Sequence, residues 1–274
     1  MKRNIQFISA QTITPDSILV REDALVVEEP LEIRISHGAG AQRRRLSVAV
    51  AMRTPGEDED LATGFLFTEG IIQDARQVLA IKWLEENTIL VELQPGLQVD
   101  EARLTRHLFT SSSCGVCGKA SLDAVQTVVC YFPGAGWPRV TREALFTLPD
   151  TLRTAQTTFE ATGGLHAAGL FEAGGKLLWL REDVGRHNAV DKVIGAALRD
   201  GHPLPFRDNL LMVSGRAGFE LVQKAAMAGI PLLAAVGAPS SLSAELAVNS
   251  GMTLVGFLRG ERFNVYSHPE RISR

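Results

Sequence analysis

Residues 209–236 read NLLMVSGRAGFELVQKAAMAGIPLLAAV, and this stretch decides the fold class. The apolar run 209–214 predicts a strand, and 219–228 predicts a helix that ends at Gly229. The next run, 231–236, predicts a second strand, and both strand runs are continuously apolar, as in strands that are covered on two faces. A strand, a helix and a strand in this order predict an α/β layer.

The same alternation continues on both sides of this stretch. It predicts two strands and a helix upstream and a helix and a strand downstream, in chain order 166–173, 176–180, 188–198, 241–248 and 253–258. We therefore expect the α/β layer to occupy the C-terminal part of the chain.

Polar residues follow three of these strands at their carboxyl ends. Ser214-Gly215-Arg216 follows the first strand, Gly237 to Ser241 follow the second, and Arg259-Gly260-Glu261-Arg262 ends the third. Ligands of α/β sheets bind outside the carboxyl ends of the strands. Free backbone N–H groups at two helix starts, together with the three arginines, predict an anion pocket suited to a diphosphate.

Two other polar stretches lie beside predicted strands. The run Arg181-Glu182-Asp183-Val184-Gly185-Arg186-His187-Asn188 is followed one helical turn later by Asp191 and Lys192. It is either a solvated turn or a buried polar network that positions a ligand or the loop that carries Cys114 and Cys117, with His187 as a possible proton carrier. His166 follows Gly163-Gly164 and is either a core histidine or a site residue.

The first hundred residues predict a small separate domain. Alternating apolar residues predict strands, and an acidic first turn predicts one helix; the five elements are 31–35, 46–52, a helix from Glu57 that Gly70 closes, 78–84 and 88–93. Two strands, a helix and two strands describe an α+β roll. We expect an N-terminal domain over 1–105 and an α/β domain over 106–274, in which 106–140 carries a pair of cysteines.

These paired cysteines lie in Ser111-Ser112-Ser113-Cys114-Gly115-Val116-Cys117-Gly118-Lys119. A structural zinc site needs four ligands, usually the two cysteines of this loop and a second Cys or His pair. The sequence has no such second pair: Cys130 lies in an apolar run typical of a buried free thiol, and His107 is a candidate third ligand, so zinc is disfavoured. An iron–sulfur cluster needs three or four thiolates, so the sequence favours it even less than zinc. A structural disulfide is disfavoured because no secretory signal opens the chain. Redox or sulfur-transfer chemistry remains, since Lys119 and the helix-like run after it favour a thiolate.

Composition excludes several classes of partner. The chain has 274 residues, 28 basic and 31 acidic, and a net charge of -3, so no global field recruits nucleic acid or an anionic membrane. No apolar run reaches the roughly 18 residues of a membrane helix. We expect a soluble, cytoplasmic protein that binds neither nucleic acid nor membrane.

Taken together, these motifs resemble the FdhD family, the formate dehydrogenase accessory sulfurtransferases. The likeness runs over nearly the whole chain, through Met52-x-Thr54-Pro55, Asp60-Leu61-Ala62-x-Gly64-Phe65-Leu66, Glu69-Gly70-Ile71, Ser113-Cys114-Gly115-x-Cys117-Gly118, Thr162-Gly163-Gly164-x-His166-Ala167-Ala168, the Arg181 to Asn188 block, Ser214-Gly215-Arg216, Phe219-Glu220 and Phe257-x-Arg259. One departure is Gly218, where other members carry Ser, so a hydroxyl role at this position is in doubt.

The resemblance implies a sulfur carrier. Such a protein takes persulfide sulfur from a cysteine desulfurase and passes it to the molybdenum bis(molybdopterin guanine dinucleotide) cofactor before insertion into formate dehydrogenase. By this likeness Cys114 carries the persulfide and Cys117 assists. The segment Phe257-Leu258-Arg259-Gly260-Glu261-Arg262 matches the guanine-dinucleotide contact, which a guanine nucleotide would mimic. Together with Ser214, Gly215, Arg216 and His187 it forms the predicted cofactor-binding set, with no resident metal.

The resemblance also implies a homodimer and a fold in which a small N-terminal domain joins a three-layer α/β core similar to cytidine deaminases. The zinc signature of deaminases is absent, because Ser precedes Cys114 and Ala-Ala follows His166. Two alternative functions stay open: a zinc-dependent deaminase-like hydrolase, and a non-catalytic chaperone of the cofactor.

Overall fold

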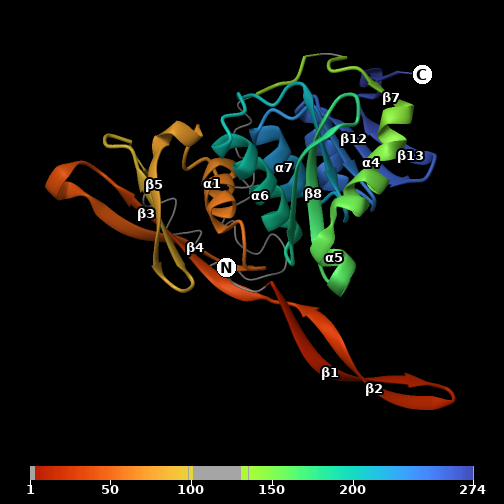
Figure 1. Ribbon diagram of the computed structural model, residues 1–274. Helices are drawn as coiled ribbons and strands as arrows, with labels where there is room; N and C mark the ends of the chain where they lie inside the picture. The colour runs from red at the N-terminus through yellow and green to blue at the C-terminus, as the bar shows by residue number, and fades with distance from the viewer. Residues whose placement is uncertain (1–3, 98, 101–130, 135, 274) are drawn as a thin grey trace.

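The computed structural model describes residues 4–97, 99–100, 131–134 and 136–273 (Figure 1). Cys114, Cys117 and Cys130 therefore lie outside the described residues, as does the short helix expected at 101–109. The boundary expected at residue 105 also falls there, so the division into two domains stays a prediction.

The largest sheet of the described chain has six strands in the order β13-β12-β11-β10-β8-β9. Its strands are β8 (His166–Glu172), β9 (Leu177–Asp183), β10 (Asn209–Val213), β11 (Leu232–Ala235), β12 (Thr253–Arg259) and β13 (Arg262–Ser267). The central strands β10, β11 and β12 are parallel, whereas β8, β9 and β13 run antiparallel to their neighbours. The predicted strands are confirmed, and β13 is an edge strand that the sequence patterns did not identify.

Helices cover both faces of this sheet (Figure 1). One face packs on α4 (Arg142–Ala155), through an apolar cluster that includes Leu148, Phe171 and Met212. The other face packs on α6 (Arg186–Arg199), α7 (Phe219–Met227) and α8 (Ser241–Asn249). Successive residues of the central strands β10 and β11 alternate between the two clusters, as expected for the side chains of a strand. The C-terminal core is therefore a three-layer α/β arrangement, while its similarity to deaminases stays a prediction.

The predicted N-terminal roll is confirmed. Its sheet has the order β4-β3-β6-β5, formed by β3 (Glu29–His37), β4 (Arg44–Arg53), β5 (Val78–Glu85) and β6 (Thr88–Leu93), with α1 (Asp58–Thr68) beside it. Leu31, Ile33 and Leu61 share one buried cluster with Val193 of α6. The roll and the α/β layer thus have a common core.

Helices α1 and α6 cross with their backbones in contact. A Cβ atom on Gly64 would lie 1.8 Å from the Asp191 carbonyl oxygen, and one on Gly195 would lie 1.9 Å from that of Asp60. Any larger residue at either position would have to separate the helices. The two glycines therefore set the distance between the roll and the α/β layer.

A two-stranded arm made of β1 (Ile5–Thr14) and β2 (Ser17–Val26) projects from the body (Figure 1). The sequence patterns assigned no strands to this region. The base of the arm contacts the short helix α5 (Thr157–Thr162): Asn4 Nδ2 donates to Thr158 Oγ1 at 3.2 Å.

The remaining short elements are η1 (Gly40–Gln42), η2 (Ala75–Gln77) and η3 (Pro269–Arg271), and β7 (Val140–Thr141), which pairs with β14 (Ile272–Ser273). Among the helices that the structure describes, none has the length and apolar character needed to cross a membrane.

Candidate functional site: the carboxyl edge of the sheet

The predicted strand ends meet at one edge of the six-stranded sheet. Parallel pairing aligns Val213 with Ala235 and Ala234 with Val255, so β10, β11 and β12 end side by side. Antiparallel pairing brings His166, the first residue of β8, opposite Asp183, the last residue of β9, at the same edge. The structure thus adds His166 and the Arg181 to Asn188 block to the three predicted loops.

Backbone hydrogen bonds join the three loops into one surface. The Gly237 N–H donates to the Gly215 carbonyl at 2.9 Å, and the Phe257 N–H donates to the Gly237 carbonyl at 3.1 Å. A Cβ on Gly237 would lie 3.0 Å from Arg216 Cα, and a Cβ on Gly215 would lie 3.3 Å from His166 Nδ1. These two glycines allow the loops to approach one another and the histidine ring.

Three helix N-termini also point toward this edge, but they differ in their free donors. Helix α8 is capped by Ser240, whose side chain accepts from the Ser243 N–H in a reciprocal capping box. Helices α6 and α7 begin after Gly185 and Gly218 and have no side-chain cap. The prediction of free N–H groups thus fits the start of α7 better than that of α8, and Gly218 stands where Ser would have capped.

The predicted arginines Arg216, Arg259 and Arg262 are all exposed. Arg259 Nε donates to the Val236 carbonyl at 3.3 Å, which holds its guanidinium over the end of β11. Gly260 and Glu261 are exposed in the turn between β12 and β13. This edge therefore offers cations and uncapped helix starts to an anion.

Phe257 and Leu258 behave differently although they are neighbours. Phe257 has a φ of +54°, in the left-handed region that non-glycine residues seldom adopt, at a break in the β12–β13 register. Its ring is partly exposed at the edge. Leu258 is fully buried in the cluster beneath α4, so its side chain supports the turn from within the core.

The Arg181 to Asn188 block forms a polar network around the buried Asp183, and its other residues are half-buried, so the structure favours the network over a solvated turn. Asp183 and Lys192 have 0% exposed side chains and are 2.9 Å apart, from Oδ2 to Nζ. Asp183 Oδ1 accepts from the Gly185 N–H and from Asn188 Nδ2, both at 2.8 Å. Its Oδ2 also accepts from the Thr54 N–H at 3.2 Å.

The same block extends to the other side of the edge through Glu182. Its carboxylate accepts from the Thr158 and Phe159 N–H groups at 2.9 and 2.8 Å, so it occupies the N-terminus of α5. On the opposite side, Arg181 Nη2 lies 2.8 Å from Asp60 Oδ2 of α1. The block therefore holds α1, α5 and α6 in position around the edge.

Two histidines differ in their surroundings at the edge. His187 Nε2 lies 2.7 Å from Glu220 Oε2, which connects the start of α6 with the first turn of α7. Burial, followed by the charge of Arg186 and the interaction with His187, lowers the pKa of His166 below its ordinary value. His166 is therefore a neutral imidazole at neutral pH, able to donate one hydrogen bond and accept another.

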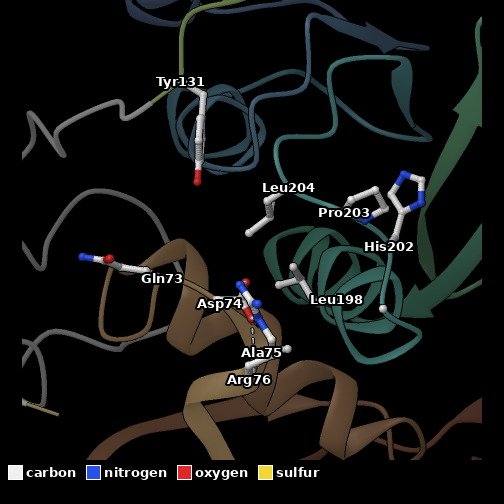
Figure 2. Close-up of a pocket in the computed structure, with 10 residues that line it drawn as sticks. Gln73, Asp74, Ala75, Arg76, Tyr131, Leu198, His202, Pro203 and Leu204 are labelled. Atoms are coloured by element: carbon white, nitrogen blue, oxygen red, sulfur yellow. Dashed lines mark hydrogen bonds and ion pairs between the residues drawn. The ribbon is translucent and has the colours of Figure 1, made fainter. Parts of the chain in front are cut away.

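A cavity of about 480 Å³ lies at the C-terminal end of α6, away from the predicted site residues (Figure 2). Asp74 and Arg76 of the η2 turn contact each other there at 2.8 Å, and Leu198 and Tyr131 face the same space. No residue of the strand-end loops lines this cavity among the described residues.

The fold and the edge define the class of protein: an α/β protein whose parallel strands end at one edge, where exposed arginines and uncapped helix starts form a candidate site for an anionic ligand. Comparison with known proteins identifies the family. The model of the FdhD/NarQ family matches residues 26–273, and the chain belongs to that family.

Individual relatives agree with this assignment. The chain is 51% identical over 269 residues to the sulfur carrier protein FdhD of Mycolicibacterium paratuberculosis, covering 95% of this chain and 96% of that protein. A protein of the same name from Sulfolobus acidocaldarius is 44% identical over 251 residues, covering 92% of each. A crystal structure described as a formate dehydrogenase accessory protein from Desulfotalea psychrophila has a TM-score of 0.76 at 26% identity, covering 99% of this chain and 100% of that one. The resemblance seen in the motifs is confirmed.

Proposed function

We propose that this protein is a sulfur carrier for formate dehydrogenase. It accepts persulfide sulfur from a cysteine desulfurase on Cys114 and transfers it, with the help of Cys117, to the molybdenum bis(molybdopterin guanine dinucleotide) cofactor. Family membership supports the proposal, as do the names of the relatives described above. The structural observation that carries it is the meeting of three strand-end loops, with Arg216 and Arg259, at one edge.

The chemistry balances with the two thiols alone. The Cys114 thiolate attacks the outer sulfur of the donor persulfide; the donor S–S bond breaks, its thiolate leaves, and an S–S bond forms on Cys114. Delivery of this zero-valent sulfur as sulfide needs two electrons. The Cys117 thiol supplies them: its thiolate attacks the inner sulfur of the Cys114 persulfide, the persulfide S–S bond breaks, and sulfide leaves as Cys114 and Cys117 close a disulfide. The sulfide would replace an oxo ligand of molybdenum, and the oxygen would leave as water with the two protons.

The edge of the sheet binds the diphosphate part of the substrate. The diphosphates of a guanine dinucleotide are anions, which Arg216, Arg259 and Arg262 and the uncapped start of α7 can bind. His187 and the loop Ser214-Gly215 belong to the same edge. We propose that the protein works as a homodimer in the cytoplasm, between the desulfurase and formate dehydrogenase.

Sulfur loading tests the first half of the proposal. After incubation with a cysteine desulfurase and cysteine, the intact mass of the protein should rise by one sulfur atom, and a reductant should remove the increase. Cys114→Ala should abolish the increase, whereas Cys130→Ala, the matched control, should retain it. An increase that survives in Cys114→Ala would contradict the assignment of the carrier thiol.

Nucleotide binding tests the second half. Arg259→Ala and Arg262→Ala should each weaken GDP binding about tenfold or more, since a hydrogen bond to a charged group contributes about 1.5–3 kcal/mol. Arg76→Ala is the control, because this side chain is 90% exposed beside the other cavity. Unchanged affinity in both edge variants would place the nucleotide elsewhere.

Two alternatives predict different outcomes of related experiments. A zinc-dependent deaminase-like hydrolase would be purified with stoichiometric zinc that is lost in Cys114→Ala or Cys117→Ala. A non-catalytic cofactor chaperone would leave formate dehydrogenase active in cells that carry Cys114→Ala, whereas the sulfur carrier predicts loss of that activity.

A further inference from the structure

The arm of β1 and β2 carries apolar side chains on both of its faces. Directly paired residues of an antiparallel ribbon point to the same face, and successive pairs alternate between the two faces. The pairing of β1 with β2 therefore places Phe7, Ile13, Ile18 and Val20 on one face and Ile8, Leu19 and Leu25 on the other. An antiparallel ribbon that rested on its own body would gather its apolar residues on one face.

Only the base of the arm is fixed to the described body. A Cβ on Gly164 would lie 3.1 Å from Val26 Cγ1, so the end of β2 packs on the turn that follows α5. Beyond this base the arm extends away from the body (Figure 1), and its most exposed apolar side chains are 59–70% exposed: Phe7, Ile13, Ile18, Leu19 and Val20. No arm residue belongs to either apolar cluster of the described chain. Because an isolated two-stranded ribbon is at best marginally stable in water, the arm needs a partner that covers it.

The outer edges of the arm are also open. Within the part of the chain that the structure describes, β1 and β2 pair only with each other, so each strand presents one row of backbone N–H and C=O groups outward. Such edges pair readily with another chain. If two arms paired only with one another, however, the resulting sheet would still expose apolar side chains on both faces. The arm must therefore lie against the body of its partner.

The size of the arm fits a reciprocal exchange between two copies of the chain. Each strand has 10 residues. The arm is therefore about 34 Å long and about 10 Å wide, which gives about 340 Å² on each face. A two-fold axis uses each arm and each receiving surface twice. Two exchanged arms would bury roughly 2,700 Å² in total, which is in the range of obligate homodimers, whereas one arm on an unrelated protein would bury half of that area.

The body itself offers apolar surface to a partner's arm. Both edge strands of the N-terminal roll expose large apolar side chains, which are Val50 and Met52 on β4 and Leu79, Trp83 and Leu84 on β5. The charged residues of the arm are of both signs, Arg21 beside Glu22 and Asp23, so the arm does not require a strongly charged partner. A second copy of this chain meets these requirements, and it is always present in equal amount.

We propose that the arm embraces the body of a second copy of this chain, which returns its own arm in the same way. The inference rests on the proposed function, which includes a homodimer, and it names the element that forms that dimer. The base of the arm is connected to the candidate site: Asn4 donates to Thr158, whose N–H donates to the Glu182 carboxylate. The exchange therefore holds the two copies together next to the carboxyl edge of the sheet.

Sedimentation velocity of the full chain tests the exchange. The wild-type chain should sediment as a dimer at micromolar concentration. Val20→Lys puts a charge where the partner covers the arm, so the dissociation constant of the dimer should rise about tenfold or more, and Ile13→Lys/Val20→Lys should sediment as a monomer. Val20→Ile keeps the apolar surface and should keep the dimer. Val248→Lys, at an exposed valine of α8, is the matched charge control and should also remain dimeric.

A fluorescent reporter shows whether the arm itself is covered. The arm contains no tryptophan, so Phe7→Trp adds an indole at a position that is exposed in the single chain. Relative to the wild-type chain, the added emission should be blue-shifted and protected from iodide quenching in the dimer. It should become red-shifted and accessible to iodide when Ile13→Lys/Val20→Lys is added. A thermal denaturation curve for each variant verifies that the body is folded.

Two results would overturn the exchange. One is a folded wild-type chain that sediments as a monomer, including a monomer whose arm is captured by the cysteine desulfurase instead. The other is a dimer that persists in Ile13→Lys/Val20→Lys, since its interface would then lie elsewhere. Both results are distinguishable from failure of the proposed function, because sulfur loading of Cys114 and the effect of Arg259→Ala on GDP binding are measured separately on the wild-type arm.

Discussion

The two sides of the sheet edge treat buried polar groups in opposite ways. On the α6 side, the carboxylate of Asp183 is paired with Lys192 and accepts three further hydrogen bonds. On the α4 side, the amide nitrogen of Gln156 is equally buried and has no partner among the described residues. The buried carboxylate on the first side is fully hydrogen-bonded, whereas the buried amide nitrogen on the second side has no partner among the described residues.

This difference indicates that Asp183, within the charged run Arg181 to Asn188, has a structural role. Burying two charges is costly, and pairing them compensates that cost without adding much stability. The pair fixes the place where β9 ends and α6 begins, and the Gly64–Gly195 crossing fixes α6 against α1. The α6 side is thus a rigid support for the edge.

Breaking the pair should give the largest effect. Asp183→Ala removes the buried carboxylate beside Lys192, whose ammonium group keeps only the Thr54 and Glu182 carbonyls and the half-exposed Glu57 carboxylate at 3.8 Å, and we expect the free energy of unfolding to fall by about 3–5 kcal/mol. Urea denaturation followed by circular dichroism measures this loss. The double variant Asp183→Ala/Lys192→Met should recover part of it, because the buried charge is gone. A loss below about 1 kcal/mol in the single variant would mean that the pair is solvated.

On the α4 side, removal of the buried polar group should change the free energy of unfolding in the opposite direction. Gln156→Met removes a donor that has no partner, so the free energy of unfolding should stay unchanged or rise by about 1 kcal/mol in the absence of ligand. The same urea experiment measures it. A decrease of similar size would show that Gln156 is satisfied within the fold, and the contrast between the two sides would disappear.

The smallest expected effect is the pH dependence of stability that arises from His166, which lies at the sheet edge where the two sides meet. Its pKa in the folded protein is lowered, chiefly by burial, whereas an unfolded histidine titrates near its ordinary value of about 6.5. Between these values the unfolded chain binds more protons, so this histidine lowers stability as pH falls below about 6.5 and has no effect above it. His166→Phe should flatten the pH dependence of the urea midpoint between about pH 7.5 and 5. An unchanged slope would mean that His166 is solvated.

Several parts of the molecule followed from local patterns. The strands β10, β11 and β12 are continuous apolar runs between helices, and such runs predict parallel strands whose ends converge. The motifs around Cys114, His166 and Arg181 were sufficient to predict the family that the comparison then confirmed.

Other parts did not follow, for identifiable reasons. Helix α4 was not predicted because Pro149 and several threonines weaken its helical pattern. Thr141 as an N-cap and the spacing of Leu145, Leu148 and Leu152 were signals that could have identified it. Because α4 and α5 were missed, Gln156 between them was missed as well. The arm of β1 and β2 was missed because its apolar residues are exposed on a ribbon rather than gathered on a core face.

The sequence by itself determined the type and order of most elements, the polar residues at the strand ends and the family of the protein, because each depends on neighbours within a few turns of chain. Tertiary structure alone decided which of these polar residues are satisfied. Asp183 obtains a donor from Thr54, 129 positions away, while Gln156 is buried by packing of α4 and obtains none that the structure describes. Burial and pairing arise from contacts between distant segments, and no local pattern encodes them.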